Sequence, residues 1–511
     1  GLPGVSSTYF GPNASRPIIR GLDGDRIRVL SNSASSVDVS ALSYDHAVPL
    51  DVLSTERIEV LRGSAALQYG GSAVGGVVNV IDNRIPREAL PGVSGKAQLQ
   101  AGTGNDERSV AGLVEAGNER WAVHVDGFDR RTGDVRVPVS LACEQTGETR
   151  YARRICNSAS QSRGGAMGAS TFWDDGYLGA SVNTYQSDYG TVAEDQVTIG
   201  MKTTRYALEG QVRHLPGMWD SVKARVSHTD YRHTEFDNGK PGTVFASQGQ
   251  DLRVEARHRA LAGWQGVLGA QVESGRFSAV GDEAFAPFSR TRSQALFVHE
   301  ELPTAWGQVN AGARWESVRV QSLGNPDLSR FEVGSRDFTP FSVAAGAAFN
   351  LSPAWRLTGN AALTQRAPKD YELFANGPHA ATGTYEQGER RSTLEKATQL
   401  DVGGAWKTGP HAFGVTGFVS RFANYLSLQP TGEFKDASGT LVSASTPDRL
   451  PVYQYEGVQA RFVGLESTAK LRLVGGQQAL WTPKASHGNL DLELRADAVR
   501  ADDLTYHRPL P

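Results

Sequence analysis

Apolar and polar residues alternate along much of the chain after residue 91. The alternation is clearest in four stretches, 205–213, 222–229, 252–259 and 490–498. A period of two predicts β-strands with one apolar face and one wet face. A barrel wall between lipid and a water-filled lumen requires this arrangement. A soluble β-sandwich with one exposed face is the alternative, but its strands are shorter and its loops more even in length.

Short turns and long connections follow one another between these expected strands. Turns rich in Pro, Gly or Trp recur at 118–121, 173–176, 215–219, 262–264, 303–306, 353–355 and 407–411. Longer polar connections lie between them, at 132–164, 187–199, 237–250, 277–289, 322–337, 367–391 and 428–452. Short turns at one end and long loops at the other are typical of outer-membrane barrels, and the count gives about 17 antiparallel strands.

The N-terminal part of the chain has a different pattern. Residues 1–90 lack long alternating stretches, and two apolar strands at 58–61 and 77–81 flank a glycine-rich turn. Phosphate-binding loops are also glycine-rich, but GxGxxG and GxxxxGK[ST] are absent and no amphipathic helix follows. Pro86, Pro91 and Gly92 mark a boundary. We therefore expect a small α+β domain at 1–90, followed by a barrel at 91–511.

Composition excludes several classes of protein. Of the 511 residues, 39% are hydrophobic and the mean hydropathy is −0.36. No apolar run is long enough to form a transmembrane helix. A net charge of −3 argues against nucleic acid as a partner. No catalytic motif is present, neither HExxH nor a nucleophile elbow nor a Ser/His/Asp order, so we do not expect an enzyme.

Two cysteines, Cys143 and Cys156, lie in one polar, Arg-rich segment. They are close together in an expected loop, which favours a local disulfide, with two free thiols as the alternative. A disulfide would fit the periplasm or the cell surface.

Three short segments combine histidine with acidic or polar neighbours. They are Tyr44-Asp45-His46, Tyr231-Arg-His-Thr-Glu235 and Gly377-Pro-His379, and the topology places the last two on the same side of the barrel. Imidazole and carboxylate together suit zinc. The spacing is not that of a local metal motif, so solvated surface histidines remain the alternative.

Two blocks within residues 16–83 resemble the plug domain of TonB-dependent outer-membrane receptors. They are Arg16-Pro-Ile-Ile-Arg-Gly-Leu-Asp-Gly-Asp25 and the glycine-rich block at 56–83. The resemblance implies a monomeric, multi-pass outer-membrane protein of a Gram-negative bacterium, with the plug in the lumen of a 22-stranded barrel. It also implies a TonB–ExbB–ExbD partner and contact with outer-membrane lipid. The chain opens at Gly1-Leu-Pro-Gly and stops at Pro511 without a terminal aromatic-ended strand, so we expect a fragment that lacks the signal peptide, the TonB box and the C-terminal strands.

Further segments look like the zinc-uptake branch of this family. They are Leu42-Ser-Tyr-Asp-His-Ala-Val-Pro49, Asn79–Pro86, Tyr231–Glu235 and 377–386. In that branch a plug Asp-His pair, a barrel Glu and a loop His bind the transported zinc. These map to Asp45, His46, Glu235 and His379, with His233 as a second-rank candidate on the same strand face as Glu235. Some zinc receptors carry a histidine-rich loop, whereas the segment at 187–199 has no histidine.

Haem is the alternative cargo. Gln365-Arg-Ala-Pro368, the loop histidine and the segment at 394–396 resemble the arrangement in haem receptors, where a histidine between two boxes ligates iron. Other metal chelates, including siderophores, are further alternatives. A passive porin or adhesin is disfavoured, because a porin has no globular plug.

Overall fold

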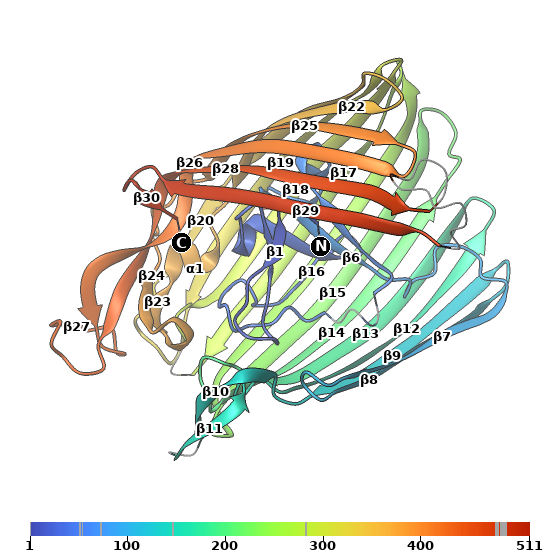
Figure 1. Ribbon diagram of the computed structural model, residues 1–511. Coiled ribbons are helices and arrows are strands. Elements are labelled where there is room, and N and C mark those ends of the chain that lie inside the picture. Colours follow the sequence, from blue (N-terminus) through green and yellow to red (C-terminus); the bar gives the residue numbers. More distant parts are fainter. Residues whose placement is uncertain are drawn as a thin grey trace.

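The computed structural model places a small N-terminal domain inside a tilted wall of long strands (Figure 1). It describes residues 2–50, 53, 55–71, 74–145, 148–281, 284–475, 480 and 488–510. Ser72 and Ala73 of the glycine-rich block lie outside the described residues.

The N-terminal domain is built around one small sheet. Its strands lie in the order β4-β3-β6-β5, with β3 parallel to β6 and β5 antiparallel to it. Gly76 opens β6 at φ +133°, and a Cβ there would meet the Leu61 carbonyl oxygen at 2.8 Å, so only glycine fits. The elements are β1 (Val5–Ser7), β2 (Pro17–Ile19), η1 (Gly24–Arg26), β3 (Ile27–Ser31), β4 (Ala34–Ser35), β5 (Arg57–Leu61), η3 (Gly63–Tyr69) and β6 (Gly76–Ile81).

The wall begins at Gly92 and is antiparallel between its long strands. Among the described residues, seventeen strands of the barrel sheet have ten residues or more, which agrees with the expected 17. They are β7 (Gly92–Gly102), β8 (Glu107–Gly117), β9 (Trp121–Thr132), β12 (Ser160–Trp173), β13 (Gly176–Gly190), β14 (Val197–Val212), β15 (Trp219–Asp237), β16 (Lys240–Leu261), β17 (Trp264–Val280), β18 (Phe288–Thr304), β19 (Gly307–Gly324), β21 (Phe341–Asn350), β22 (Trp355–Arg366), β25 (Glu395–Thr408), β26 (His411–Lys435), β28 (Leu450–Val474) and β29 (Leu490–Asp503).

Shorter elements lie at the end of the wall that carries the long connections. The sheet order returns from β30 (Arg508–Pro509) to β7, but the long ladders end at β8–β7 on one side and β28–β29 on the other. The side chains of β7 and β29 are mostly exposed on both faces. The remaining elements are the β10 (Arg136–Gln145) and β11 (Glu148–Arg154) hairpin, β20 (Val333–Phe338), α1 (Asp370–Phe374), β23 (Asn376–His379), η4 (Ala380–Thr382), β24 (Thr384–Gln387) and β27 (Leu441–Val442).

All seven short turns predicted from the sequence fall between consecutive long strands. The expected long loops all overlap strand residues, and two of them coincide with long extensions of wall strands. Residues 240–250 belong to β16, which turns back from β15 through Asn238-Gly239 alone, and β26 runs on to Lys435. In both places strands extend beyond the wall as hairpins, so polar composition there reflects exposed strands.

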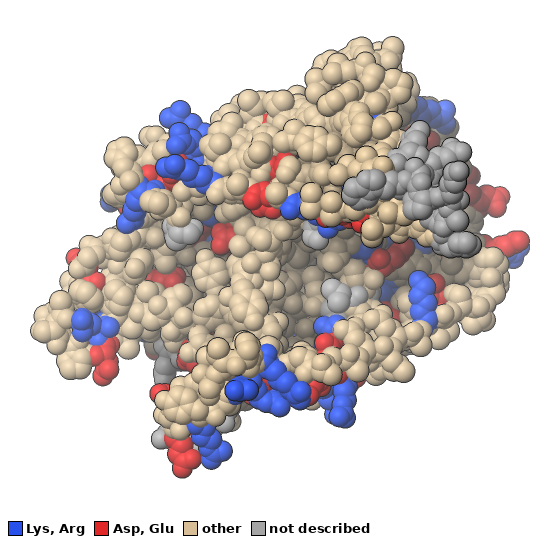
Figure 2. Space-filling view, in the orientation of Figure 1, with Lys and Arg blue, Asp and Glu red and all other residues tan. Residues whose placement is uncertain are grey.

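The alternation seen in the sequence separates an outer apolar face from a polar lumen. In β14, Tyr206 and Leu208 are exposed, whereas Arg205 and Glu209 are buried. Figure 2 shows the charged side chains of the visible face mainly toward the strand ends and around the β10–β11 hairpin. Among the described helices, none has the length and apolar character needed to cross a membrane.

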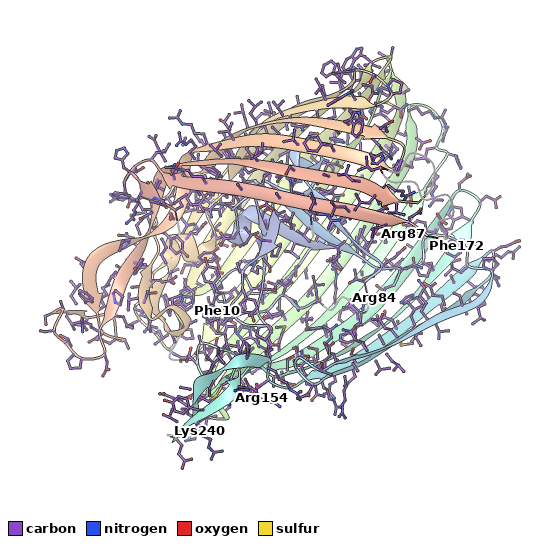
Figure 3. All side chains as sticks on the ribbon, viewed as in Figure 1. Phe10, Arg84, Arg87, Arg154, Phe172 and Lys240 are labelled. Atoms are coloured by element: carbon purple, nitrogen blue, oxygen red, sulfur yellow. A yellow bond between two sulfur atoms is a disulfide. The ribbon has the colours of Figure 1, made fainter. Side chains whose placement is uncertain are left out.

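Ion pairs and one apolar cluster hold the N-terminal domain in the lumen. Arg84 binds Asp126 of β9 at 2.9 Å, and Arg87 binds Glu209 of β14 at 2.6 Å, at the segment where the chain passes into the wall (Figure 3). At strands β26 and β28, Ile19 and Ile27 of the N-terminal domain pack in one buried cluster with wall residues such as Phe422 and Phe462.

Candidate metal centre

A loop of the N-terminal domain carries Asp45 and His46 to the wall. The loop follows β4, and the Tyr189 hydroxyl of β13 clamps it by accepting a hydrogen bond from the Ala47 N–H (2.9 Å) and donating one to the Asp45 carbonyl (3.0 Å). Val39 and Ala47 of this loop pack in one buried cluster with Tyr189, Tyr231 and other wall residues. His46 is only 2% exposed, so its imidazole is fixed against the wall.

Strand β15 supplies the groups that face His46. Residues 231, 233 and 235 share one face of a strand because side chains alternate, and all three point into the lumen. His233 is completely buried, and its Nδ1 lies 2.8 Å from the Tyr231 hydroxyl. Phe245, the register partner of His233 on β16, packs against both imidazoles, with ring centroids 4.7 Å from His233 and 5.1 Å from His46.

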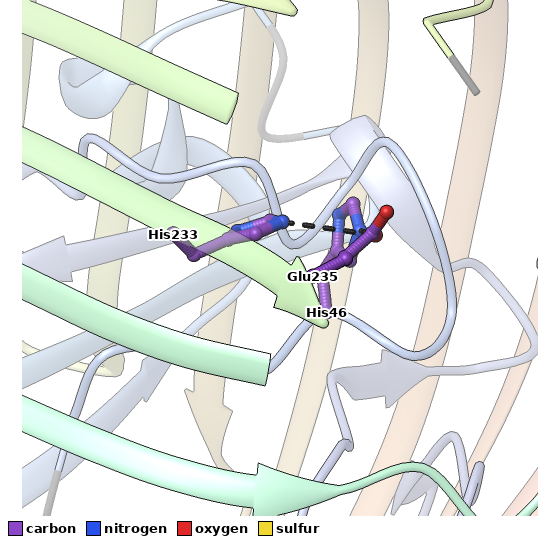
Figure 4. A group of neighbouring side chains, drawn as sticks. All are labelled: His46, His233 and Glu235. Atoms are coloured by element: carbon purple, nitrogen blue, oxygen red, sulfur yellow. Dashed lines mark hydrogen bonds and ion pairs between the residues drawn. The ribbon is translucent and has the colours of Figure 1, made fainter. Parts of the chain in front are cut away.

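His46, His233 and Glu235 converge at one point (Figure 4), and their ligand atoms lie within 4.8 Å of one another. The Glu235 Oε1 atom is 3.1 Å from His46 Nε2 and 3.8 Å from His233 Nε2, and Asp45 Oδ1 is 3.9 Å from His46 Nε2. Ligands about 2.0–2.1 Å from a tetrahedral zinc ion lie roughly 3.3 Å apart. The Glu235–His46 spacing is close to that value, whereas the spacings of 3.8 and 3.9 Å are longer, so the side chains would have to move closer together to close the shell.

Each imidazole makes a hydrogen bond through its Nδ1 atom, so its Nε2 atom faces the point where the side chains converge. His46 Nδ1 donates to the Val39 carbonyl at 3.1 Å, because a carbonyl can only accept. His233 Nε2 is buried and has no hydrogen-bond partner among the described residues. When His233 Nδ1 donates to Tyr231, the lone pair of its Nε2 faces Glu235. An imidazole oriented through its second nitrogen is typical of metal-ligating histidines.

The charge around His46 favours a cation at this point. Burial alone lowers the pKa of His46, but the neighbouring carboxylates of Asp45 and Glu235 outweigh it and raise the pKa to about 9. In the absence of metal the proton on His46 therefore takes the place of a cation between two carboxylates.

His379 lies one hydrogen bond away from this group. Its Nε2 is 2.7 Å from the Ser43 hydroxyl, which in turn binds the Asp45 carboxylate, and its Nδ1 is 2.7 Å from Glu386. Its ring stacks on Phe285 with centroids 4.3 Å apart. Both nitrogens are occupied, so His379 orients Asp45 through Ser43 in this arrangement.

The structure thus brings His46, His233 and Glu235 together, places Asp45 beside His46, and links His379 to Asp45 through Ser43. Sequence reasoning did not single out Ser43, Tyr189 or Glu386. Ser43 and Glu386 lie within the segments at 42–49 and 377–386 that resemble zinc receptors, so proximity to the candidate histidines could have indicated them. Tyr189 carried no such signal.

The β10–β11 hairpin stands at the same end of the wall. A disulfide joins Cys143 and Cys156, whose Cα atoms are 5.8 Å apart, and ties this hairpin to the segment that leads into β12.

Two family models match the chain and cover both of its parts. Residues 144–508 match the TonB dependent receptor-like β-barrel, and residues 1–77 match the TonB-dependent receptor plug domain. The chain belongs to the TonB-dependent receptor family. The N-terminal domain is its plug, the wall is its outer-membrane β-barrel, and members of this family are receptors and transporters rather than enzymes.

Curated relatives of this receptor share only part of their length with it. A rhizobactin receptor of Rhizobium meliloti (strain 1021) is 34% identical over 132 residues, which are 25% of this chain and 16% of the relative. The vitamin B12 transporter BtuB of Photobacterium profundum is 35% identical over 136 residues, 25% of this chain and 21% of the relative. The aligned region thus spans about a fifth or less of each relative.

Among solved structures, the copper transporter OprC matches with a TM-score of 0.77 and 16% identity, covering all of this chain and 76% of that one. The siderophore receptor PirA from Pseudomonas aeruginosa matches with a TM-score of 0.65 and 17% identity, covering 98% of this chain and 82% of that one. At these identities the likeness extends to the fold alone.

Proposed function

We propose that this receptor imports zinc across the outer membrane of a Gram-negative bacterium, energised by the TonB–ExbB–ExbD complex. The zinc ion would bind between plug and barrel, with His46 and Asp45 on one side and His233 and Glu235 on the other. The receptor would act as a monomer, because plug and wall of one chain supply the whole ligand set.

The observation that carries the proposal is the pair of Nε2 atoms that face one carboxylate. A completely buried nitrogen without a hydrogen-bond partner among the described residues, such as His233 Nε2, costs free energy unless something binds it. Zinc accepts imidazole and carboxylate ligands together, and three such groups converge on one point with Asp45 beside His46.

The distribution of ligands over two domains suits transport. The TonB complex would pull on the plug, and movement of the plug loop would carry Asp45 and His46 away from Glu235 and His233. Each half alone offers two ligands, and zinc held by two ligands exchanges more readily with water. The ion would then be released into the lumen on the periplasmic side.

Haem receives less support from the same geometry. The loop histidine, His379, is buried and already uses both ring nitrogens, so it offers no free nitrogen to a macrocycle. Arg366 of the Gln365–Pro368 element is also buried and binds Glu372 and Glu395. Both residues therefore have structural partners that account for them.

Copper is the second candidate, because of one specific residue. Met201 of β14 is the register partner of His233, and it is buried in the same cluster as Tyr231 and Phe245. A thioether beside imidazoles favours Cu(I), whereas the two carboxylates favour zinc. The test therefore has to compare the two metals directly.

The test measures metal binding to the detergent-purified receptor and metal uptake by cells. Zinc should bind tightly at one site per chain. His46→Ala should lower the zinc affinity of that site by about 100-fold or more, while surface expression is unchanged. His214→Ala is the matched control, because this histidine is exposed at a short turn and bonds to Asp175. Zinc binding that is the same in His46→Ala and wild type contradicts the proposal. Tight Cu(I) binding that zinc cannot displace supports copper instead.

A further inference from the structure

A second polar cavity lies in the lumen below the candidate metal centre. Its volume is about 300 Å³, and it is enclosed between the plug loop at 35–41 and strands β15 to β19. The same loop forms the roof, since Val39 binds His46 on one side while Asp38, Ser40 and Ala41 line the cavity on the other. From Phe245 to Asp251 is six residues along β16, or about 20 Å toward the short-turn end of the barrel.

Most of the charged side chains that line this cavity are already neutralised. Asp25 pairs with Lys369 at 3.1 Å, and Glu316 with Arg314 at 2.8 Å. Glu273 binds Arg28 and Ser35 of the plug. Arg16, another basic residue of the lining, donates from Nη2 to the Gly24 carbonyl at 3.2 Å, whereas its Nε and Nη1 have no hydrogen-bond partner among the described residues. Asp38 accepts hydrogen bonds from its own loop, including the Ser40 N–H at 2.9 Å.

Asp251 is the exception among the acidic residues. It is only 6% exposed, its Oδ2 accepts a hydrogen bond from Gln271 at 2.7 Å, and its Oδ1 has no hydrogen-bond partner among the described residues. It forms no ion pair with a described residue either. A buried carboxylate with an unsatisfied oxygen is unfavourable while it is ionised, and a cation in the cavity that Asp251 lines would offset that cost.

The neighbour of Asp251 adds a second reason for a cation here. Asp251 and Glu273 are register partners on β16 and β17 and both face the lumen. Like charges directly opposite each other on neighbouring strands destabilise a sheet. A divalent cation between the two carboxylates would remove that repulsion, to which Arg28 of the plug responds by binding Glu273 while it acts on Asp251 through its charge alone.

We propose that Asp251, with Glu273 beside it, forms a second cation site in the lumen that takes a partly hydrated divalent ion. The site is made of oxygen ligands, in contrast to the imidazoles above it, so it binds zinc less tightly and discriminates less between zinc and manganese. Its position on the way from the upper centre toward the periplasm makes it a transit site for the imported ion, and this role in transport rests on the proposed function.

Manganese binding tests the site independently of the upper centre. Mn²⁺ titrated into the detergent-purified receptor and followed by electron paramagnetic resonance should show one bound ion per chain. Asp251→Asn, which keeps the shape of the side chain, should lower the Mn²⁺ affinity at least tenfold, while His46→Ala leaves it unchanged. Asp230→Asn is the matched control, because Asp230 lies on the outward face of β15 and is 44% exposed.

Zinc uptake tests the transit role. Asp251→Asn should lower the initial rate of zinc uptake several-fold while zinc still binds tightly at the upper centre. Glu273→Gln provides a second variant for Mn²⁺ binding if Asp251→Asn does not accumulate in the membrane. Equal Mn²⁺ affinity in wild type and variant, or no Mn²⁺ binding to the wild type, overturns the site. If substitution of His46 leaves zinc binding unchanged while Mn²⁺ binding still depends on Asp251, the proposed function is contradicted. The lower cation site is supported in that case.

Discussion

The plug meets the barrel in two contrasting ways on different parts of the wall. At β25, the buried Arg26 of the plug binds Glu395 at 2.7 Å, and Arg366 of the barrel binds Glu395 and Glu372 at 3.1 and 2.8 Å. At β15, His46 of the plug faces Glu235 and His233, and the His233 Nε2 atom has no hydrogen-bond partner among the described residues.

The difference separates attachment from binding. Each carboxylate at the β25 contact has a guanidinium partner, so this contact holds the plug in place and offers nothing to a ligand. The β15 contact brings ligand atoms together and leaves one of them, His233 Nε2, without a hydrogen bond, so an added ion would complete it. A receptor that must hold its plug and also release a cargo has a use for both kinds of contact.

The largest effect should come from breaking the contact at β25, in which each carboxylate already has a guanidinium partner. Glu395→Ala leaves the buried Arg26 without its carboxylate, and removal of one partner from a buried ion pair costs about 3–5 kcal/mol. The free energy of plug opening should fall by that amount, which limited proteolysis of the purified receptor measures as faster cleavage within residues 2–81. Glu301→Ala, at a half-exposed carboxylate near a short turn, is the control. Unchanged cleavage would show that other contacts hold the plug.

The next prediction compares the effects of two histidines at the β15 contact, His233 and His379, on zinc affinity. His233→Ala should lower zinc affinity by about 100-fold or more, because loss of a ligand exceeds the roughly 10–100-fold cost of losing an outer partner. His379→Ala should fall within that smaller range, because His379 acts on Asp45 through Ser43. Isothermal titration with zinc compares the two. A larger loss for His379→Ala would mean that His379 leaves Ser43 and binds the ion itself.

Tyr231→Phe tests the orientation of His233 without removing a ligand. The variant deletes only the hydroxyl that lies 2.8 Å from His233 Nδ1, so the ring keeps its packing against Phe245. Zinc affinity should fall about 10–100-fold, the usual cost of an outer-shell partner. Tyr206→Phe, on the exposed face of β14, is the control. Equal affinities in the two variants would show that packing alone orients the imidazole.

The sequence predicted the wall well, because the alternation of apolar and polar residues reflects the physical boundary between lipid and lumen. It failed at 237–250, where Asn238-Gly239 is a two-residue hairpin signal that the polar composition of the segment obscured. A turn dipeptide carried more information there than overall polarity.

The site could be predicted only in part, for a different reason. Asp45, His46 and Glu235 were named from the sequence through a resemblance, but the relative positions of His233 and His379 depend on where the loop at 38–49 docks against the wall. Tyr189 and Val39 fix that docking, through contacts that no local sequence pattern shows. The Asp251 Oδ1 atom without a hydrogen bond could not be predicted for the same reason, since only the tertiary structure shows which carboxylates have partners.

The effect that is smallest per step of the experiment is a dependence of zinc affinity on pH, which only the contact at β15 should have. His46 has a pKa of about 9 in the folded receptor, raised from the ordinary value of 6.5 because the carboxylates of Asp45 and Glu235 outweigh the effect of burial. Protonation of His46 therefore stabilises the seated plug fully below about pH 6.5, and this contribution is lost as the pH rises through about 9. Zinc must displace the same proton, so its affinity should rise about tenfold per pH unit between about pH 7 and 9 and level off above that. Titrations at about pH 7, 8 and 9 measure the slope, and the release of one proton per zinc in buffers of different ionisation enthalpy checks its origin. His46→Gln should bind zinc weakly and with little dependence on pH in this range, whereas a wild-type affinity that is flat across it would place the ion away from His46.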